Sequence, residues 1–499
     1  MSNSSNIKIE NVYKLFLFSF SLAILTYGFA LTNFTLSIDN EIPILSNFGL
    51  DLGRWGQNLI RYHLFNGHLQ YFSFILSLFL FSISAAKIAS LFKFENLSAY
   101  FFCALFITFP QISYQVIFSM MADVAGLGIL ISVYSVELFL KALETKTIIK
   151  KTLLFWTVAL ILMFALSIYQ VLILVPITIY LILFFQKTFD DTFKLNLELK
   201  KTFIFGGILI ASVIFYYLSV KIICPPIENG GYLSSYTTGN SDNAFSNFLT
   251  LLKNNLEGSA YYGEKLYFLV SLLVIILTIK FLLNKRYFIY RFLILFFLIL
   301  SPFVVSYFIT NGYHPPRLYL TSNIVFAFII VFALNQFKSI YYNTSKIIVV
   351  VLIIITNIYF VTNLFYTANR IYRHDKKIAE KIDYTIQTKY PNFATTEKFV
   401  YFYGYFPYEY HQKFRLQNSE IFGGSYYNWD NGNNYRINKF FEVADIAEYK
   451  MIDTKEKFDM IKDSIDKMPI WPDYKSVKMI DNVVIVKLGK EKGMPISVE

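Results

Sequence analysis

Long apolar runs alternate with short polar stretches up to about residue 370 of the chain. Most runs are close to 20 residues long, the length that a helix needs to cross a hydrocarbon layer of about 30 Å. The pattern predicts an all-α polytopic membrane protein, although residues 152–187 can form one bent hairpin or two short helices. We expect about eleven transmembrane helices, near residues 12–34, 69–91, 98–117, 119–140, 152–167, 170–187, 202–222, 266–284, 291–309, 319–337 and 346–366.

The pattern changes after about residue 370, where the sequence becomes mixed polar. Residues 398–404 and 482–488 are typical of strands, and residues 371–389 and 454–467 have helical periodicity. We therefore expect two domains, a transmembrane domain over residues 1–370 and a small α/β domain over residues 371–499. Neither contains a P-loop, a dinucleotide-binding fingerprint or an internal repeat, which argues against a transport ATPase.

Basic residues are distributed unequally between alternate loops, and this predicts the orientation. One set of loops carries 18 Lys and Arg residues, whereas the opposite loops, although longer, carry six. Loops rich in Lys and Arg face the cytoplasm. The N-terminus is then cytoplasmic, and an odd number of spans places the α/β domain outside. The first apolar run is too long for the core of a signal peptide, so we expect an uncleaved span.

Composition agrees with a membrane protein. Charged residues make up only 16% of the chain, against about 25% in soluble proteins, and the mean hydropathy is +0.47. The net charge of +11 comes from the basic loops, so we expect no nucleic-acid partner. Cys103 and Cys224 form no disulfide framework, and no residue cluster has the spacing of a metal site.

The first stretch that could carry chemistry lies just beyond the first predicted span. Ser37-Ile38-Asp39-Asn40-Glu41 places two carboxylates two residues apart in an outer loop. An apolar boundary makes a carboxylate more basic, which suits a general base. The alternative is a polar loop in which Asp39 only caps a turn.

The second stretch, residues 52–62, has the pattern of an amphipathic helix lying in the membrane plane. Leu52, Trp55, Leu59 and Tyr62 share one face, and Arg54, Gln57, Asn58 and Arg61 share the other. Arginine side chains can bind a lipid phosphate through two hydrogen bonds. The alternative is ordinary interfacial anchoring, with both arginines touching bulk headgroups.

Four further candidate residues lie on the same predicted outer face. His314 and Arg317 occupy the loop Asn311-Gly-Tyr-His-Pro-Pro-Arg317 and could bind phosphate or stabilise a leaving group. Asp123 begins a predicted span, and Gln170 lies between two short ones. A polar or ionisable side chain at membrane depth is costly and is a functional candidate for that reason.

Together these motifs resemble those of the serotype-converting O-antigen glucosyltransferases of bacteria and their phages, the Gtr type II family of the GT-C fold class. The matching pieces are the acidic segment Ser37–Glu41, Gly53-Arg54-Trp55, Met121-Ala-Asp123, Ser167-Ile-Tyr-Gln170, Pro316-Arg317 and the C-terminal soluble domain. The resemblance implies a GT-C-like glycosyltransferase of the bacterial inner membrane, with its active site and C-terminal domain in the periplasm. It covers most of the chain, and the order of the motifs carries more weight than any one of them.

The resemblance also implies a reaction and partners. The donor would be a sugar, typically glucose, on undecaprenyl phosphate, and the acceptor a hydroxyl of O-antigen or another lipopolysaccharide glycan. Asp39 would be the general base with Glu41 supporting it. Arg54 and Arg317 would neutralise the leaving phosphate, and Asp123 would shape a substrate pocket. Members of this family act with a donor-making glycosyltransferase and a small flippase.

Chemical reasoning supports a lipid-linked donor, because nucleotide sugars are absent outside the cytoplasm. Direct displacement would invert the anomeric carbon, and no second carboxylate is placed as a nucleophile. No metal or other cofactor is required, although Asp39 and Glu41 could hold a divalent cation. The alternatives are a transporter or flippase of lipid-linked glycans, another GT-C enzyme acting on protein or lipid A, and a surface-glycan polymerase.

The C-terminal domain has two possible roles. Its stretch Gly423-Gly-Ser-Tyr-Tyr-Asn-Trp-Asp430 offers aromatic side chains on which a sugar of the acceptor could stack. The domain could equally pack over the active site without binding glycan, and the sequence slightly favours this second role.

Overall fold

The computed structural model describes residues 2–226, 244–283, 287–309, 313–336, 342–391, 393, 399–406 and 416–497. The chain forms two compact units. The helical unit comprises Met1–Leu31 and Ile44–Thr362, and the C-terminal unit comprises Thr32–Pro43 and Asn363–Glu499. The segment Thr32–Pro43, which carries the predicted acidic residues, is therefore grouped with the end of the chain. The expected domains over residues 1–370 and 371–499 stay a prediction.

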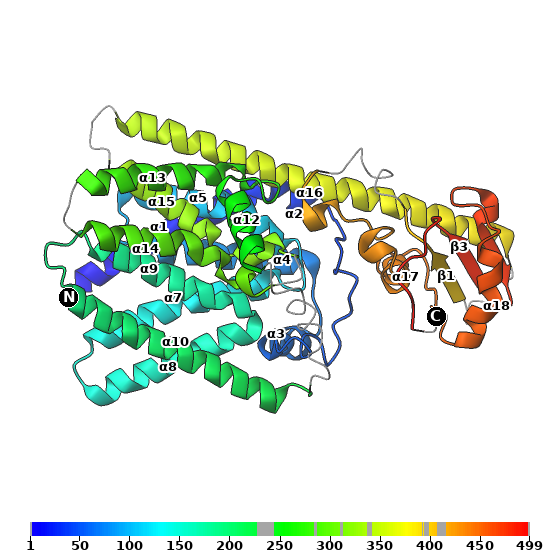
Figure 1. Cartoon of the computed structure of the whole chain (residues 1–499), viewed down its shortest axis with the longest axis horizontal. Coiled ribbons are helices and arrows are strands. Elements are labelled where there is room, and N and C mark those ends of the chain that lie inside the picture. The colour runs from blue at the N-terminus through cyan, green and yellow to red at the C-terminus, as the bar shows by residue number, and fades with distance from the viewer. Residues whose placement is uncertain are drawn as a thin grey trace. The chain divides into compact units, whose positions relative to one another are not determined.

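The helical unit consists of apolar helices that run side by side (Figure 1). Its longer helices are α1 (Ser2–Thr26), α4 (Gln70–Leu91), α5 (Asn96–Thr108), α7 (Ala122–Glu144), α8 (Ile148–Ile168), α9 (Leu174–Lys187), α10 (Leu195–Ile223), α12 (Ala244–Leu256), α13 (Phe268–Leu283), α14 (Phe288–Leu300), α15 (Ser322–Asn335) and the first part of α16 (Tyr342–Lys389). Short helical turns connect them: α2 (Gly28–Thr32), α3 (Trp55–Asn58), η1 (Leu59–Leu64), η2 (Pro110–Ile112), α6 (Ser113–Val116), η3 (Gln170–Ile173), η6 (Glu264–Tyr267), η7 (Ser301–Phe308) and η8 (Pro316–Tyr319).

Eight helices in the described part of the chain are long and apolar enough to cross a membrane. A ninth is obtained if the pair Asn96–Thr108 and Pro110–Val116, bent by 41°, counts as one span. Two shorter apolar helices, Asn11–Thr26 and Ser322–Asn335, lie where the sequence predicts the first and tenth spans. The helical membrane character is confirmed, whereas the total of eleven spans and the GT-C architecture stay predictions.

Small residues bring the central helices close together. Gly126 of α7 faces α4, where an added Cβ would lie 3.1 Å from Leu80, and Gly128 packs directly on Leu172 of η3. Buried serines of α4 return their hydroxyl hydrogen bonds to their own helix, as Ser82 does to the carbonyl of Leu78 at 2.7 Å. Apolar helices pack tightly in this way when no polar side chain needs a partner across the interface.

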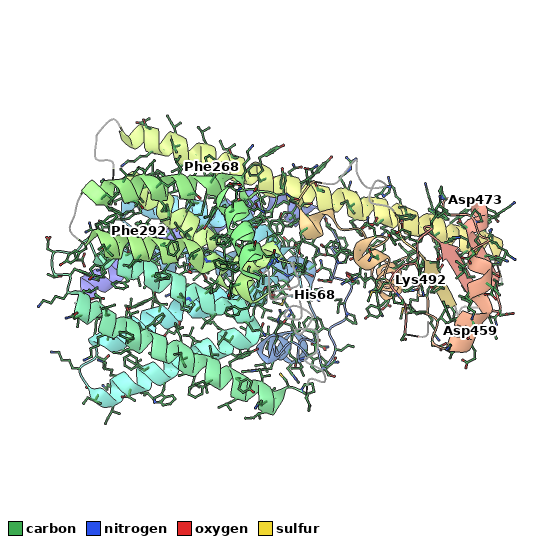
Figure 2. All side chains as sticks on the ribbon, viewed as in Figure 1. His68, Phe268, Phe292, Asp459, Asp473 and Lys492 are labelled. Carbon is green, nitrogen blue, oxygen red and sulfur yellow. The ribbon has the colours of Figure 1, made fainter. Side chains whose placement is uncertain are left out.

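The outer surface of the helical unit is apolar, whereas that of the C-terminal unit is charged. Figure 2 labels Phe268 on α13 and Phe292 on α14, and both rings are exposed. It also labels Asp459, Asp473 and Lys492 of the C-terminal unit, which are exposed as well. Large exposed apolar surface is unfavourable in water and suits contact with lipid.

The C-terminal unit contains a three-stranded sheet with helices beside it (Figure 1). The strands are β1 (Phe399–Tyr403), β2 (Val477–Ile480) and β3 (Val483–Lys487), in the order β1-β3-β2, with β1 parallel and β2 antiparallel to β3. The other elements are the polar end of α16, η10 (Glu420–Gly423), η11 (Trp429–Asn431), α17 (Asn434–Val443), α18 (Lys455–Ile465) and η12 (Tyr474–Ser476). The predicted mixed α/β character and both predicted strands are confirmed, although Lys398 lies outside the described residues.

Candidate active site

The acidic segment forms a tight turn within the C-terminal unit. The N–H of Asn40 donates to the carbonyl of Ser37 at 3.0 Å, and that of Ile42 donates to Asp39 at 3.2 Å. Asp39 adopts a left-handed backbone with φ of 75°, a conformation that Asp tolerates better than most residues. The turn leaves the Asp39 side chain 27% exposed and buries that of Glu41 completely.

Arg436 of α17 binds both carboxylates of this turn. Its Nη1 lies 2.8 Å from Oδ1 of Asp39 and also pairs with Oε1 of Glu41. Its Nε donates to Oδ2 of Asp430 at 2.6 Å. The backbone around Arg436 is fixed by Asn433, the N-cap of α17, whose side chain accepts from the N–H groups of residues 435 and 436. Three carboxylates therefore share one guanidinium.

Burial controls the charge of this cluster. Burial raises the pKa of Glu41 from 4.5 to about 7, with a further increase from Asp39, although Arg436 opposes both. Burial alone would lower the pKa of Arg436, but Asp39, Glu41 and Asp430 together raise it. Oε2 of Glu41 is buried and has no hydrogen-bond partner among the described residues. Glu41 can thus exchange a proton near neutral pH while Arg436 stays charged.

A buried tyrosine is hydrogen-bonded to the backbone of the acidic turn. Tyr426 donates its hydroxyl hydrogen bond to the carbonyl of Ser37 at 2.7 Å, and its ring stacks on Phe440 with centroids 4.1 Å apart. The N–H of Tyr426 donates to Asp375 at 2.9 Å. Tyr426 and Tyr427 are both buried, so these two tyrosines of the stretch 423–430 cannot stack on a sugar in this structure. Their role here is packing.

Arg54 and Gln170 meet in the helical unit. Arg54 Nε donates to Oε1 of Gln170 at 3.4 Å, and the Arg54 guanidinium lies over the ring of Tyr169, 4.9 Å from its centre. Gln170 is itself held by Tyr216, whose hydroxyl accepts from Nε2 at 2.8 Å. Trp55 donates its indole N–H to Ser219 at 2.9 Å. The structure therefore brings together two residues that lie 116 positions apart in the sequence.

The predicted amphipathic helix forms as two short turns, α3 and η1, and most of its polar face is buried in the protein. Gln57, Asn58 and Arg61 of the polar face are buried in the protein, whereas Leu59 of the apolar face is 46% exposed. The reason is that buried polar partners are available to the polar face. Asn58, for example, donates to the carbonyls of residues 46 and 48, both at 3.0 Å.

Arg61 and Asp123 form a buried ion pair with side-chain exposures of 1% and 2%. Arg61 Nη2 pairs with Oδ1 of Asp123, and Nη1 donates to Oδ2 at 3.3 Å. Arg61 also donates to the carbonyls of Met120 at 2.6 Å and Ser119 at 3.2 Å. This pair joins η1 to the start of α7. A direct contact of either residue with substrate stays a prediction.

Arg317 lies close to the same α6–α7 connection. Its guanidinium is 4.9 Å from the ring centre of Phe118, and η8 is held by Gln111, which donates to the carbonyl of Pro316 at 3.2 Å. His314 is partly buried, and burial lowers its pKa below the usual value. Asn311 and Gly312 of this motif lie outside the described residues. The helical unit thus gathers Arg317, Arg61 and Asp123 around one loop.

Two residues of interest were not predicted from the sequence. Arg436 carries no clear local signal, because the two carboxylates of the acidic turn that it binds lie almost 400 residues away and only Asp430 is close in sequence. Glu264 of η6 is buried in the helical unit, and its Oε2 accepts from the N–H of Ala260 at 3.1 Å. The sequence pattern does not single it out, because it lies at the border between a polar loop and the predicted span 266–284. A buried carboxyl at the end of a span would have been the signal to follow.

The described residues contain no group of three or more His, Cys, Asp and Glu side chains that could hold a metal ion. Asp39 and Glu41 both pair with the guanidinium of Arg436. The described side chains can therefore offer a base, a proton-exchanging partner and, in the helical unit, two arginines able to bind an anion.

Comparison with known proteins identifies the family. Neither a curated protein nor a solved structure matches the chain. The family model described as glucosyl transferase GtrII matches residues 28–334, which include all of the predicted site residues. This range is more than half of the 499 residues. The chain belongs to the GtrII glucosyl transferase family.

Proposed function

We propose that the protein transfers glucose from undecaprenyl phosphate to a hydroxyl of a surface glycan, such as O-antigen, on the periplasmic side of the bacterial inner membrane. Membership of a glucosyl transferase family supports the transferred group. The unequal distribution of basic residues supports the orientation. A lipid-linked donor follows from the location, because nucleotide sugars are made and used in the cytoplasm.

The observation that carries the proposal is the carboxylate pair Asp39 and Glu41 beyond the first apolar helix. Asp39 takes the proton of the acceptor hydroxyl as its oxygen attacks the anomeric carbon of the donor. The new glycosidic bond forms, the bond from carbon to phosphate oxygen breaks, and the configuration inverts. The lipid phosphate leaves with the electron pair, and Asp39 later releases its proton to water.

Arginines of the helical unit are proposed to bind the leaving phosphate. Arg317 is partly buried and Arg54 is hydrogen-bonded to Gln170, so neither guanidinium is fully solvated. A phosphodiester that becomes a phosphate monoester gains negative charge, and fixed cations stabilise that gain. A protonated leaving group is then unnecessary, which agrees with a mechanism that needs a base and no strong acid.

The test uses purified protein in lipid vesicles with radiolabelled undecaprenyl-phosphate-glucose and surface glycan from a strain that lacks this enzyme. Wild type should label the glycan, and Asp39→Asn should not. Asp51→Asn, which changes an exposed carboxylate of the neighbouring loop, is the matched control and should be active. A fully active, folded Asp39→Asn would refute the base. Movement of the lipid across the bilayer without glycan labelling would favour a flippase instead.

Orientation is tested independently by alkaline phosphatase and green fluorescent protein fusions at residue 490. Phosphatase activity without fluorescence is expected, because the phosphatase folds outside the cytoplasm. A fluorescent, phosphatase-negative fusion would move the acidic segment and the arginine loops to the cytoplasmic side and overturn the proposal.

A further inference from the structure

One guanidinium serves every carboxylate of the acidic turn. Arg436 Nη1 contacts both Asp39 and Glu41, and its Nε binds Asp430 at 2.6 Å. All of these residues belong to the C-terminal unit. The family match ends at residue 334, about 100 residues before Arg436, so nothing in that match assigns a role to it.

We propose that Arg436 is a positioning residue for glycosyl transfer, which orients Asp39 and sets the charge balance under which Asp39 accepts a proton. The inference depends on the proposed function of Asp39 as general base. It gives the C-terminal unit a direct part in activating the acceptor, since α17 supplies the side chain that holds the base.

Exposure separates the roles of the two carboxylates. The Glu41 side chain is completely buried, whereas that of Asp39 is 27% exposed. Only Asp39 can therefore reach an acceptor hydroxyl. One of its oxygens is held by Arg436, which turns the carboxylate and leaves the second oxygen for the substrate. Glu41 shares the same Nη1, so it acts on Asp39 through Arg436 as well as by direct repulsion between the two carboxylates.

Charge balance explains why one arginine serves three carboxylates. A lone arginine would neutralise Asp39 and oppose proton transfer to it. Here Glu41 and Asp430 contact the same guanidinium, so its positive charge is not directed at Asp39 alone. When Asp39 is protonated, Arg436 still pairs with Glu41 and Asp430, and the cluster does not separate during turnover.

The surroundings add no second cation among the described residues that contact the cluster. The titratable groups facing Arg436 are Asp39, Glu41, Asp430 and the hydroxyl of Tyr426, which donates to the carbonyl of Ser37. Arg436 is held from its own backbone by the Asn433 cap and from its Nε by Asp430. A planar guanidinium can make these contacts at fixed angles, whereas a lysine ammonium cannot.

The experiment measures kcat against pH in the vesicle assay for four variants. Arg436→Gln removes the positive charge, so the acidic limb of the profile should move up by about 1 pH unit or more. Because Asp39 also loses its orientation, kcat on the plateau above that limb should fall by about 10-fold or more. Asp430→Asn removes a negative charge and should move the limb to lower pH. Arg436→Lys should keep the limb near its wild-type position but lower kcat. Lys439→Gln, on the same helix with only a local ion pair to Glu442, is the matched control and should behave as wild type.

A purely structural role of Arg436 would lower the amount of folded enzyme equally at every pH and leave the limb in place. That result in both Arg436→Gln and Asp430→Asn, together with an inactive Asp39→Asn, would overturn the inference and leave the proposed function standing. An active Asp39→Asn would overturn the proposed function itself. If Arg436→Gln does not fold, Asp430→Asn alone decides. The inference predicts that its acidic limb moves to lower pH, whereas a general loss of folded enzyme leaves the limb in place.

Discussion

The ion pair between Arg61 and Asp123 gives the sharpest test of how the helical unit is held together. The Asp123→Ala substitution removes both carboxylate oxygens from a guanidinium that is 1% exposed. Removing one partner of a buried pair costs about 3–5 kcal/mol, because the other charge stays buried without compensation. Arg61 retains its bonds to the carbonyls of Met120 and Ser119 and its long contact with Ser73, so we expect about 3 kcal/mol.

The loss is measured as the midpoint of thermal unfolding in detergent, followed by tryptophan fluorescence. At about 2 °C per kcal/mol for a large domain, Asp123→Ala should lower the midpoint by about 6 °C. The double variant Arg61→Met with Asp123→Ala removes both charges and should recover part of that loss. Lys87→Met is a useful control, since Lys87 and Glu137 are paired but each about 30% exposed, and its cost should stay below about 1 kcal/mol.

Two results would refute this reasoning. An unchanged midpoint for Asp123→Ala would mean that the buried pair does not stabilise the fold. If the loss of stability in the double variant equals the sum of the losses in the two single variants, the two residues act separately. If Arg61 instead binds the donor phosphate freely, Asp123→Ala should leave stability intact and strengthen donor binding, which a donor titration would reveal.

Three further predictions follow from particular contacts. Burial raises the pKa of Glu41 to about 7, so its contribution to the free energy of unfolding is complete below about pH 4.5 and is lost as the pH rises through 7. The thermal unfolding midpoint of Glu41→Gln should therefore vary less between pH 5 and 8 than that of wild type. Gly56→Ala should lower the free energy of unfolding by about 1–3 kcal/mol, since its Cβ would overlap Ser167 Oγ and lie 3.1 Å from the Ser167 carbonyl carbon. In the same denaturation series Gly206→Ala, whose Cβ would have nothing within 4 Å, should be neutral or slightly stabilising. Arg317→Ala should raise the KM for the lipid donor about 10-fold or more without changing that for the acceptor, and an unchanged donor KM would remove its proposed phosphate role.

Local patterns explain what could be predicted from the sequence. Apolar runs near 20 residues long placed most of the long helices, because the thickness of a bilayer fixes that length whatever the rest of the fold does. The strands Phe399–Tyr403 and Val483–Lys487 were anticipated within one residue at each end, since their β-branched and aromatic runs are short-range signals. Strand β2, whose four residues include Lys478, has no comparable run.

Pairing between distant residues explains what was missed. The periodicity of residues 52–62 predicted an amphipathic helix, but it could not show that Asp123 and the neighbouring carbonyls would bind Arg61 inside the protein. Likewise, Asp39 and Glu41 were singled out as a pair, whereas their shared partner Arg436 has no sequence signal at all. A charged residue finds its partner through the tertiary fold, and one sequence without a structure does not contain that information.

The division of the chain also constrains how the enzyme can be made. Thr32–Pro43 belongs to the C-terminal unit, and the contacts from Glu41 to Arg436 and from Ser37 to Tyr426 span 395 and 389 residues. At roughly 5–20 residues per second, the ribosome needs about 20–80 s to make that stretch. During this time the acidic segment has already been synthesised, but Arg436 and Tyr426, which bind it in the folded protein, have not. A nascent chain that stops before residue 436 therefore carries its two carboxylates without their arginine, and the arrangement of the acidic turn can form only after Arg436 has been added.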